Sequence, residues 1–212
     1  MCGINDNLIG YLGMVTEQEE LRCGAILLPG VVVFPNNAVP LHIFEPRYRK
    51  MLSDAVEGGG CFVIGSLLEE EVRDGVEPRS IAVLVDISVN KALPDGRSLL
   101  IVSAKQRVKV LSWDMEGVYP RAICEKLERK VSADSETIIA LLKDSFAVVL
   151  DKYAEKEREL LCGHLDTIES QEVVIDLIAQ HTIRDDGVRR FMLEEESDSK
   201  RAAELLLLLE TM

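Results

Sequence analysis

The residues best suited to acid–base chemistry lie in one short stretch that contains His42, Glu45, Arg47 and Arg49. Imidazole and carboxylate groups at such a spacing could exchange protons with a substrate. A structural interpretation competes, because Glu45 stands at the start of an expected helix, where a carboxylate complements the helix dipole. Arg47 can pair with a nearby carboxylate or carbonyl, and His42 lies on an expected strand. We therefore predict that this group is structural and that the chain has no catalytic residue.

The five cysteines offer two further chemistries, and neither is complete. Removal of Met1 would expose Cys2 as an N-terminal nucleophile with its own α-amine as base, as in class II glutamine amidotransferases, but the downstream Arg-Gly motifs of those enzymes are missing. Cys162 and His164, together with His181, could supply part of a zinc site, yet zinc needs four ligands and no second cysteine pair is present. We expect no metal, no cofactor, and mostly buried thiols in a reducing compartment.

Three cations, Lys105, Arg107 and Lys109, alternate with Val108 and Val110 along an expected strand. Alternate residues of a strand share one face, so the three cations would form a stripe that could hold an anionic ligand or RNA. Aromatic residues that could stack on bases make up only 5% of the chain, and a charged alternating strand is usually a solvated sheet face. RNA binding is therefore an alternative and not the favoured function.

The composition is that of an ordinary globular protein. The chain has 212 residues, of which 47% are hydrophobic and 29% charged, and its net charge is −13, with most of the acidic excess after residue 130. Such a charge disfavours nucleic acid and anionic lipid as partners. The first residues lack a basic signal-peptide region, and no apolar run is long enough to span a membrane. We expect a cytoplasmic protein.

The pattern from residue 23 to 130 is mainly that of strands. Residues 81–89 alternate with a period of two, Leu93 to Arg97 supply turn chemistry, and an apolar run follows from Leu99 to Val102, which together predict a hairpin. One helix interrupts the strands, with Pro46 at its first position and three glycines, 58–60, at its end. Several short strands at this spacing favour a barrel or a sandwich.

After residue 130 the period becomes helical. A long helix is expected from Ser135 to Gly163, and shorter helices should begin at Ser170, at Asp185 and at Ser197. The predicted organisation is therefore an N-terminal segment over 1–22, a β domain over 23–130 and a helical bundle over 131–212.

The most distinctive part of the sequence is a motif made of Leu28-Pro29, Val33-Phe34-Pro35, Pro40-Leu41-His42-Ile43-Phe44 and Glu45-Pro46-Arg47-Tyr48. It resembles the N-terminal, substrate-binding domain of the Lon protease family, and the resemblance extends over about residues 23–212. It implies an α+β fold in which a PUA-like β pseudo-barrel precedes a helical bundle. The motif residues expected to have structural roles are Pro35, His42, Glu45, Pro46, Arg47 and Tyr48.

Full-length Lon enzymes add an ATPase module and a Ser-Lys peptidase module. No Gly-x4-Gly-Lys-[Ser/Thr] phosphate loop occurs in this sequence. We expect a free-standing, non-catalytic domain.

The resemblance implies binding of unfolded or partner polypeptides, with an adaptor role beside another protein. A groove between barrel and bundle would be lined by Val32, Phe34, Ile43 and Phe44, although the same residues could simply fill the core. The alternative function is a small-ligand or RNA reader that uses the PUA-like barrel.

Overall fold

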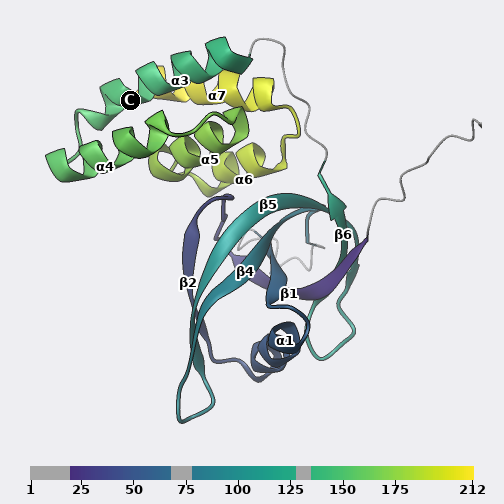
Figure 1. Ribbon diagram of the computed structural model, residues 1–212. Coiled ribbons are helices and arrows are strands. Elements are labelled where there is room, and N and C mark those ends of the chain that lie inside the picture. The colour runs from purple at the N-terminus through teal and green to yellow at the C-terminus, as the bar shows by residue number, and fades with distance from the viewer. Residues whose placement is uncertain (1–19, 68–77, 128–134) are drawn as a thin grey trace, which may run out of the picture.

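The computed structural model describes residues 20–67, 78–127 and 135–212. A strongly curved sheet with one helix beneath it is followed by a layer of helices packed above it (Figure 1). The elements are β1 (Leu21–Pro29), β2 (Ala38–Ile43), α1 (Pro46–Glu57), β3 (Cys61–Leu67), β4 (Ile81–Ala92), β5 (Ser98–Asp114), β6 (Arg121–Lys126), α3 (Ser135–Leu150), α4 (Glu155–Asp166), α5 (Gln171–Thr182), α6 (Asp186–Glu194) and α7 (Asp198–Glu210). The predicted α+β fold, a barrel-like sheet followed by a helical bundle, is confirmed.

The sheet has the strand order β2-β5-β4-β3-β1-β6 and is closed by an additional pairing of β5 with β6. β5 is 17 residues long, so it can pair with β2 and β4 and still reach β6. Its register with β4 shifts at two places and its register with β6 at one, and such bulges bend a strand. The closure leaves β2 as a strand with one unpaired edge among the described strands.

Two local predictions in the β domain are confirmed. Helix α1 begins at Pro46 and buries Tyr48, Met51, Leu52 and Ala55, the four residues at helical spacing. The turn between β4 and β5 lies at residues 93–97, where Gly96 has a φ of 80°. A side chain at that glycine would also collide with the guanidinium of an arginine from α1.

The helical half departs from prediction at one place. The single helix expected from Ser135 to Gly163 is two helices, α3 and α4, joined by a turn at residues 151–154, and Gly163 lies inside α4. The turn lets the hydroxyl of Tyr153 donate to the carbonyl of His181 at 3.1 Å, a contact that a continuous helix does not require. Glycine only weakens a helix interior, so Gly163 alone could not end the helix.

The starts of the last three helices match prediction. Ser170, Asp185 and Ser197 occupy the N-cap positions of α5, α6 and α7. The carboxylate of Asp185 accepts a hydrogen bond from the backbone N–H of Val188 at 2.8 Å. The hydroxyl of Ser197 accepts one from the backbone N–H of Lys200.

The structure corrects the expected solvated face at Arg107. This side chain, only 3% exposed, crosses from β5 into the bundle. Its guanidinium donates to the carbonyl oxygens of Leu193 and Glu195 at 3.1 and 2.7 Å and lies 3.3 Å from the carboxylate of Glu172 and 3.5 Å from that of Asp198. The prediction failed because these partners lie 65 to 91 residues further along the chain.

A second arginine completes the buried ionic cluster. Arg201 of α7 is fully buried and donates to Asp176, to Asp198 at 3.3 Å and to the carbonyl of Met192 at 2.6 Å. Asp198 therefore lies between Arg107 and Arg201 and connects the sheet to the bundle. Buried charges of this kind are tolerated only when they are paired and hydrogen-bonded.

A third arginine crosses the same interface in the opposite direction. Arg189 of α6 donates to the carbonyl of Val32 at 2.9 Å, and its guanidinium carbon lies 5.1 Å from the ring centroid of Phe34. One hydrophobic cluster also includes Phe34 from the β domain together with Ile178 and Leu193 from the bundle. The sheet and the bundle therefore share a core.

The predicted division of the chain stays a prediction. β1 begins at Leu21, two residues before the expected start of the β domain. The boundary near residue 130 falls within 128–134, and the segment that contains Cys2 falls within 1–19, both outside the described residues.

The buried stripe of α3 leads to a first prediction. Leu142 is fully buried and its neighbour Leu141 is 50% exposed. We expect Leu142→Asp to lower the free energy of unfolding by at least several kcal/mol, because a carboxylate would be buried without a partner. Leu141→Asp should change it by less than about 0.5 kcal/mol. Equal melting temperatures for Leu142→Asp and the wild type would contradict the packing.

Asp176 leads to a prediction about pH. Burial raises the pKa of its carboxyl from 3.8 to about 6, although Arg201 and Arg107 favour the charged form. A pKa raised in the folded state means that this group's contribution to stability is present below pH 4 and is lost as the pH rises through 6.

Asp176→Asn removes this titration and keeps the shape of the side chain. The unfolding free energy of the variant relative to the wild type should therefore rise between pH 4 and pH 7, by up to roughly 3 kcal/mol. Denaturant titrations at several pH values measure it. A difference that is constant with pH, or that falls, would contradict the assignment.

Candidate functional site

Of the four residues expected to line a groove, the structure presents one to solvent. Val32, Phe34 and Ile43 are buried in the core, and two of them contact Arg189 at the interface with the bundle. The core-filling alternative therefore describes these three residues. Phe44 is 58% exposed and lies just after β2.

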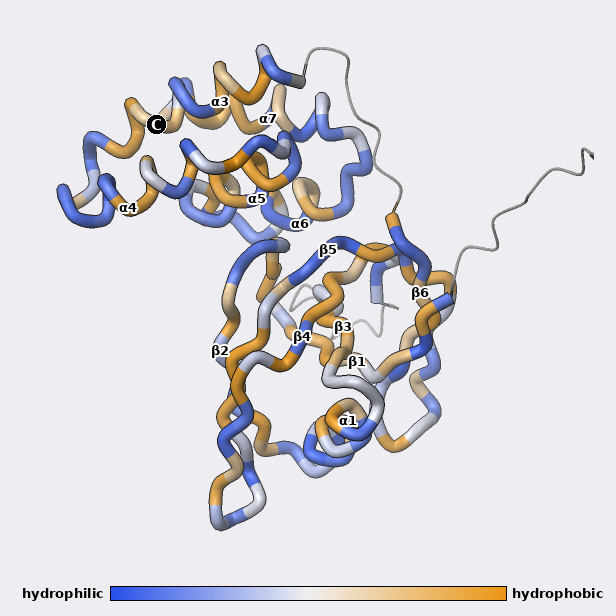
Figure 2. The backbone as a smooth tube through the Cα atoms, in the orientation of Figure 1, coloured by the Kyte–Doolittle hydropathy of each residue, from blue (hydrophilic) through white to orange (hydrophobic). Residues whose placement is uncertain are grey.

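Phe44 adjoins an exposed apolar surface on the outer face of β2, β5 and β4. Pro40 of β2 is opposite Ile101 of β5, which is opposite Val89 of β4, and residues paired in this way share a face of the sheet. Leu99 lies two residues before Ile101 and therefore faces the same side. All of these residues are exposed, and we call the group Pro40, Phe44, Val89, Leu99 and Ile101 the apolar sheet face. Apolar segments alternate with polar ones where β2, β4 and β5 run together (Figure 2).

His42 belongs to the same row of the sheet. It is exposed, is paired with Leu99 across β2 and β5, and its ring lies 5.6 Å from that of Phe44 at an angle of 51°. Its ring therefore extends the apolar sheet face toward Phe44.

The open edge of β2 adds backbone groups to this surface. β2 pairs with β5 on one side, and no described strand pairs with its other side. Pro40 has no N–H, and proline is tolerated in strands at such edges. An extended segment could therefore add to β2 by backbone hydrogen bonds while its side chains contact the apolar sheet face.

The remaining motif residues have structural roles at the start of α1. Arg47 donates to the carboxylate of Glu45 at 2.8 Å, and its guanidinium carbon lies 4.5 Å from the ring centroid of Tyr48. The expected pairing of Arg47 with a carboxylate is confirmed. The Tyr48 hydroxyl accepts from the backbone N–H of Leu27, which ties α1 to β1.

Pro35 belongs to the turn that precedes β2. Its carbonyl accepts from the side-chain amide of Asn37 at 2.9 Å, and Asn36 has a φ of 61°. This turn positions the start of β2 and thus the apolar sheet face.

The three cations predicted to form a stripe on β5 each have carboxylate partners of their own. Lys105 lies 3.3 Å from the carboxylate of Asp86, and Lys109 lies 3.6 Å from that of Glu125, while Arg107 is buried in the bundle. The structure therefore contains no continuous patch of these three cations for an anionic ligand.

Two other expectations concern metals and membranes. Within 20–67, 78–127 and 135–212, no three His, Cys, Asp or Glu side chains are grouped so that they could hold a metal ion, and this includes Cys162, His164 and His181. No helix among the same residues combines the length and the apolar character needed to cross a membrane.

Sequence reasoning missed Val89, Leu99 and Ile101 as surface residues. Leu99 to Val102 is apolar at every position, so it contributes to both faces of the sheet. On a sheet with one buried face, such a run leaves alternate apolar residues exposed, which is the signal that could have identified this surface.

Known proteins resemble this chain over most of its length. A family model described as the ATP-dependent protease La (LON) substrate-binding domain matches residues 23–211. A Lon protease of Flavobacterium johnsoniae is 22% identical over 172 residues, which cover 78% of this chain and 21% of that protein. A LON peptidase N-terminal domain and RING finger protein of Schizosaccharomyces pombe is 25% identical over 123 residues, which cover 52% of this chain and 25% of that protein.

Two solved structures have the same fold. The N-terminal domain of the Mycobacterium avium complex Lon protease superposes with a TM-score of 0.73 at 15% identity, over 90% of this chain and 98% of that one. A Lon N-terminal domain protein from Xanthomonas campestris gives 0.62 at 20% identity, over 88% of this chain and 98% of that one. The chain spans about a fifth to a quarter of the curated relatives. With its sequence matched from residue 23 to 211, it belongs to the family of LON substrate-binding domains.

Proposed function

We propose that this chain is a non-catalytic recognition module that captures extended, apolar polypeptide segments on the apolar sheet face. The observation that carries the proposal is the exposure of Phe44, Val89, Leu99 and Ile101 on neighbouring strands beside the open edge of β2. Contiguous apolar surface of this kind marks an interaction site in soluble proteins. Membership of a substrate-binding family supports polypeptide as the ligand.

The chemistry of the surface favours an extended segment. Backbone groups on the free edge of β2 can pair with any sequence, which suits a module that binds many clients. Alternate side chains of the segment would then lie against the apolar sheet face. Desolvated apolar contact contributes about 25 cal/mol per Å², and association costs leave a net affinity around the micromolar range.

An adaptor role follows from the same proposal. A module that holds a polypeptide weakly can present it to a separate ATPase, protease or other partner protein. We place this module in the cytoplasm, because the four described cysteines, Cys23, Cys61, Cys124 and Cys162, are free thiols. RNA is not proposed as the ligand, because Lys105 and Lys109 are paired with carboxylates and Arg107 is buried.

Binding of an unfolded chain tests the proposal. We expect a fluorescein-labelled, reduced and carboxymethylated polypeptide to bind with a Kd that changes little with salt. Ile101→Glu should raise this Kd at least about tenfold, because a carboxylate would be desolvated in the complex. Val148→Glu, on an exposed apolar residue of α3, is the matched control and should bind like the wild type. Equal binding by wild type and Ile101→Glu would refute this site.

The absence of turnover is tested in the same mixture. With ATP and Mg²⁺ added, we expect neither loss of the labelled polypeptide nor release of phosphate, because the sequence has no phosphate-binding loop. Hydrolysis that follows the protein through repeated purification would show that the module is an enzyme.

A further inference from the structure

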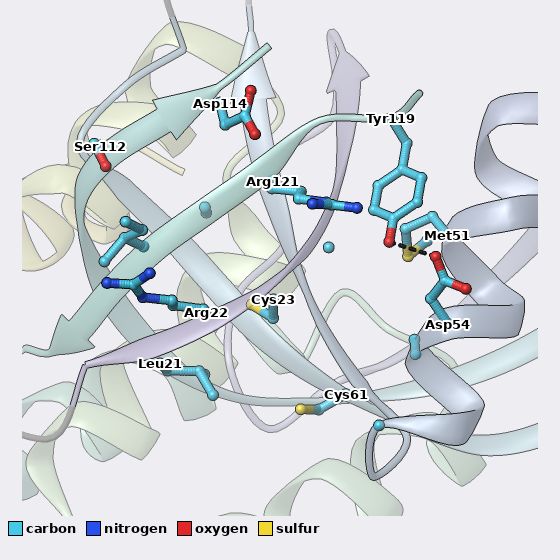
Figure 3. A pocket seen from close by; sticks show the side chains of 15 residues that line it. Leu21, Arg22, Cys23, Met51, Asp54, Cys61, Ser112, Asp114, Tyr119 and Arg121 are labelled. Carbon is cyan, nitrogen blue, oxygen red and sulfur yellow. Dashed lines mark hydrogen bonds between the residues drawn. The ribbon is translucent and has the colours of Figure 1, made fainter. Parts of the chain in front are cut away.

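A pocket separate from the apolar sheet face lies beside α1, where β1, β6 and the end of β5 meet (Figure 3). Its volume is about 450 Å³, within the range of small-ligand sites. Gly24 of β1 makes this site possible, since a Cβ there would lie 2.6 Å from Met51 Cγ and 3.3 Å from the Tyr119 ring. The missing side chain thus allows the helix and Tyr119 to approach the strand.

Arg121 is the cation on the wall of this pocket that has no carboxylate partner. Its guanidinium carbon lies 5.0 Å from the ring centroid of Tyr119, and its charge is among those that lower the pKa of Asp54, but none of the described carboxylates lies within ion-pair distance of it. Figure 3 shows the guanidinium directed across the pocket toward Tyr119. The nearby Asp54 is already engaged, because Lys50 donates to it at 2.6 Å and the Tyr119 hydroxyl at 2.7 Å. Lys50 thus holds the Asp54 carboxylate, and that carboxylate holds the Tyr119 hydroxyl. The Tyr119 ring in turn contacts the guanidinium of Arg121.

The rest of the lining is largely apolar or neutral. Met51 is fully buried, and Leu21 and Ile123 line the pocket from β1 and β6. The thiols of Cys23 and Cys61 also face it. A hydrogen bond with Cys124 raises the pKa of Cys23, and burial raises that of Cys61, so both are neutral at physiological pH.

We propose that this pocket binds a carboxylate attached to an apolar group. The planar guanidinium of Arg121 pairs with the carboxylate, and the apolar group lies against Leu21, Ile123 and the two thiols, which are partly exposed. The other charged residues of the lining, Arg22, Asp54 and Asp114, leave the site balanced once Arg121 is counted. The lining as a whole is therefore neutral, and the group that favours an anion is Arg121 itself, which can pair with one carboxylate, whereas the two charges of a phosphate would also face the two aspartates.

This chemistry has two sources, the C-terminal residue of a polypeptide and a free small carboxylic acid. Four probes distinguish them: a labelled peptide with a free C-terminal leucine, the same peptide as its C-terminal amide, N-acetyl-leucine and N-acetyl-leucinamide. Peptides are measured by fluorescence anisotropy, and the small probes by competition with the labelled free-acid peptide.

We expect the free-acid peptide to bind at least tenfold more tightly than its amide. Arg121→Gln should remove this preference, and Lys109→Gln, an exposed cation on the same sheet but outside the pocket lining, should retain it. Thermal melting of both variants checks that they fold. The preference should also persist in Ile101→Glu, so a failure of the proposed polypeptide surface and a failure of this pocket are distinguishable.

If N-acetyl-leucine competes with an affinity equal to that of the free-acid peptide, and N-acetyl-leucinamide does not compete, the ligands are free acids. Tighter binding of the peptide identifies polypeptide C-termini, and both results support the site. Equal binding of acid and amide, no binding of either, or an unchanged preference in Arg121→Gln would overturn it.

Discussion

The burial of Arg107 between the sheet and the bundle is the constraint on which the rest of this structure depends. A guanidinium removed from water requires counter-charges and carbonyl acceptors, and here all of them come from residues 172–198 in the helical part of the chain. Breaking such a buried pair leaves an uncompensated charge and costs about 3 to 5 kcal/mol. Arg107 therefore links β5 to the bundle through every one of these partners. Arg189, which reaches from the bundle to Val32, holds the same interface from the other side.

This interface also decides which apolar residues are free for function. Val32 and Phe34 are buried in this interface, so they stabilise the fold and are not accessible to a ligand. The apolar residues that remain exposed lie on the outer face of β2, β5 and β4, on strands fixed at their other ends by the closed sheet. In the proposed function, the open edge of β2 is already held in an extended conformation by its pairing with β5, which would lower the ordering cost of binding an extended chain.

Local sequence signals predicted local structure well. Pro46, the turn at 93–97 and the caps Asp185 and Ser197 were predictable because each acts within a few residues of itself. The burial of Arg107 could not be predicted, because alternation along one strand cannot show that carboxylates from α5 and α7 cover its side chain. Phe44 was predicted to line a groove between barrel and bundle, and its place beside Val89 and Ile101 could not be predicted, because only strand pairing brings these residues together.

Site-specific photo-crosslinking tests the central claim, capture of polypeptide on the apolar sheet face, most directly. A photoreactive residue placed at Ile101 and another placed at Leu160, an exposed leucine of α4, would be irradiated with a labelled unfolded polypeptide. The account predicts a crosslinked product at position 101 and little at position 160. Equal labelling at both positions, or labelling confined to position 160, would contradict it.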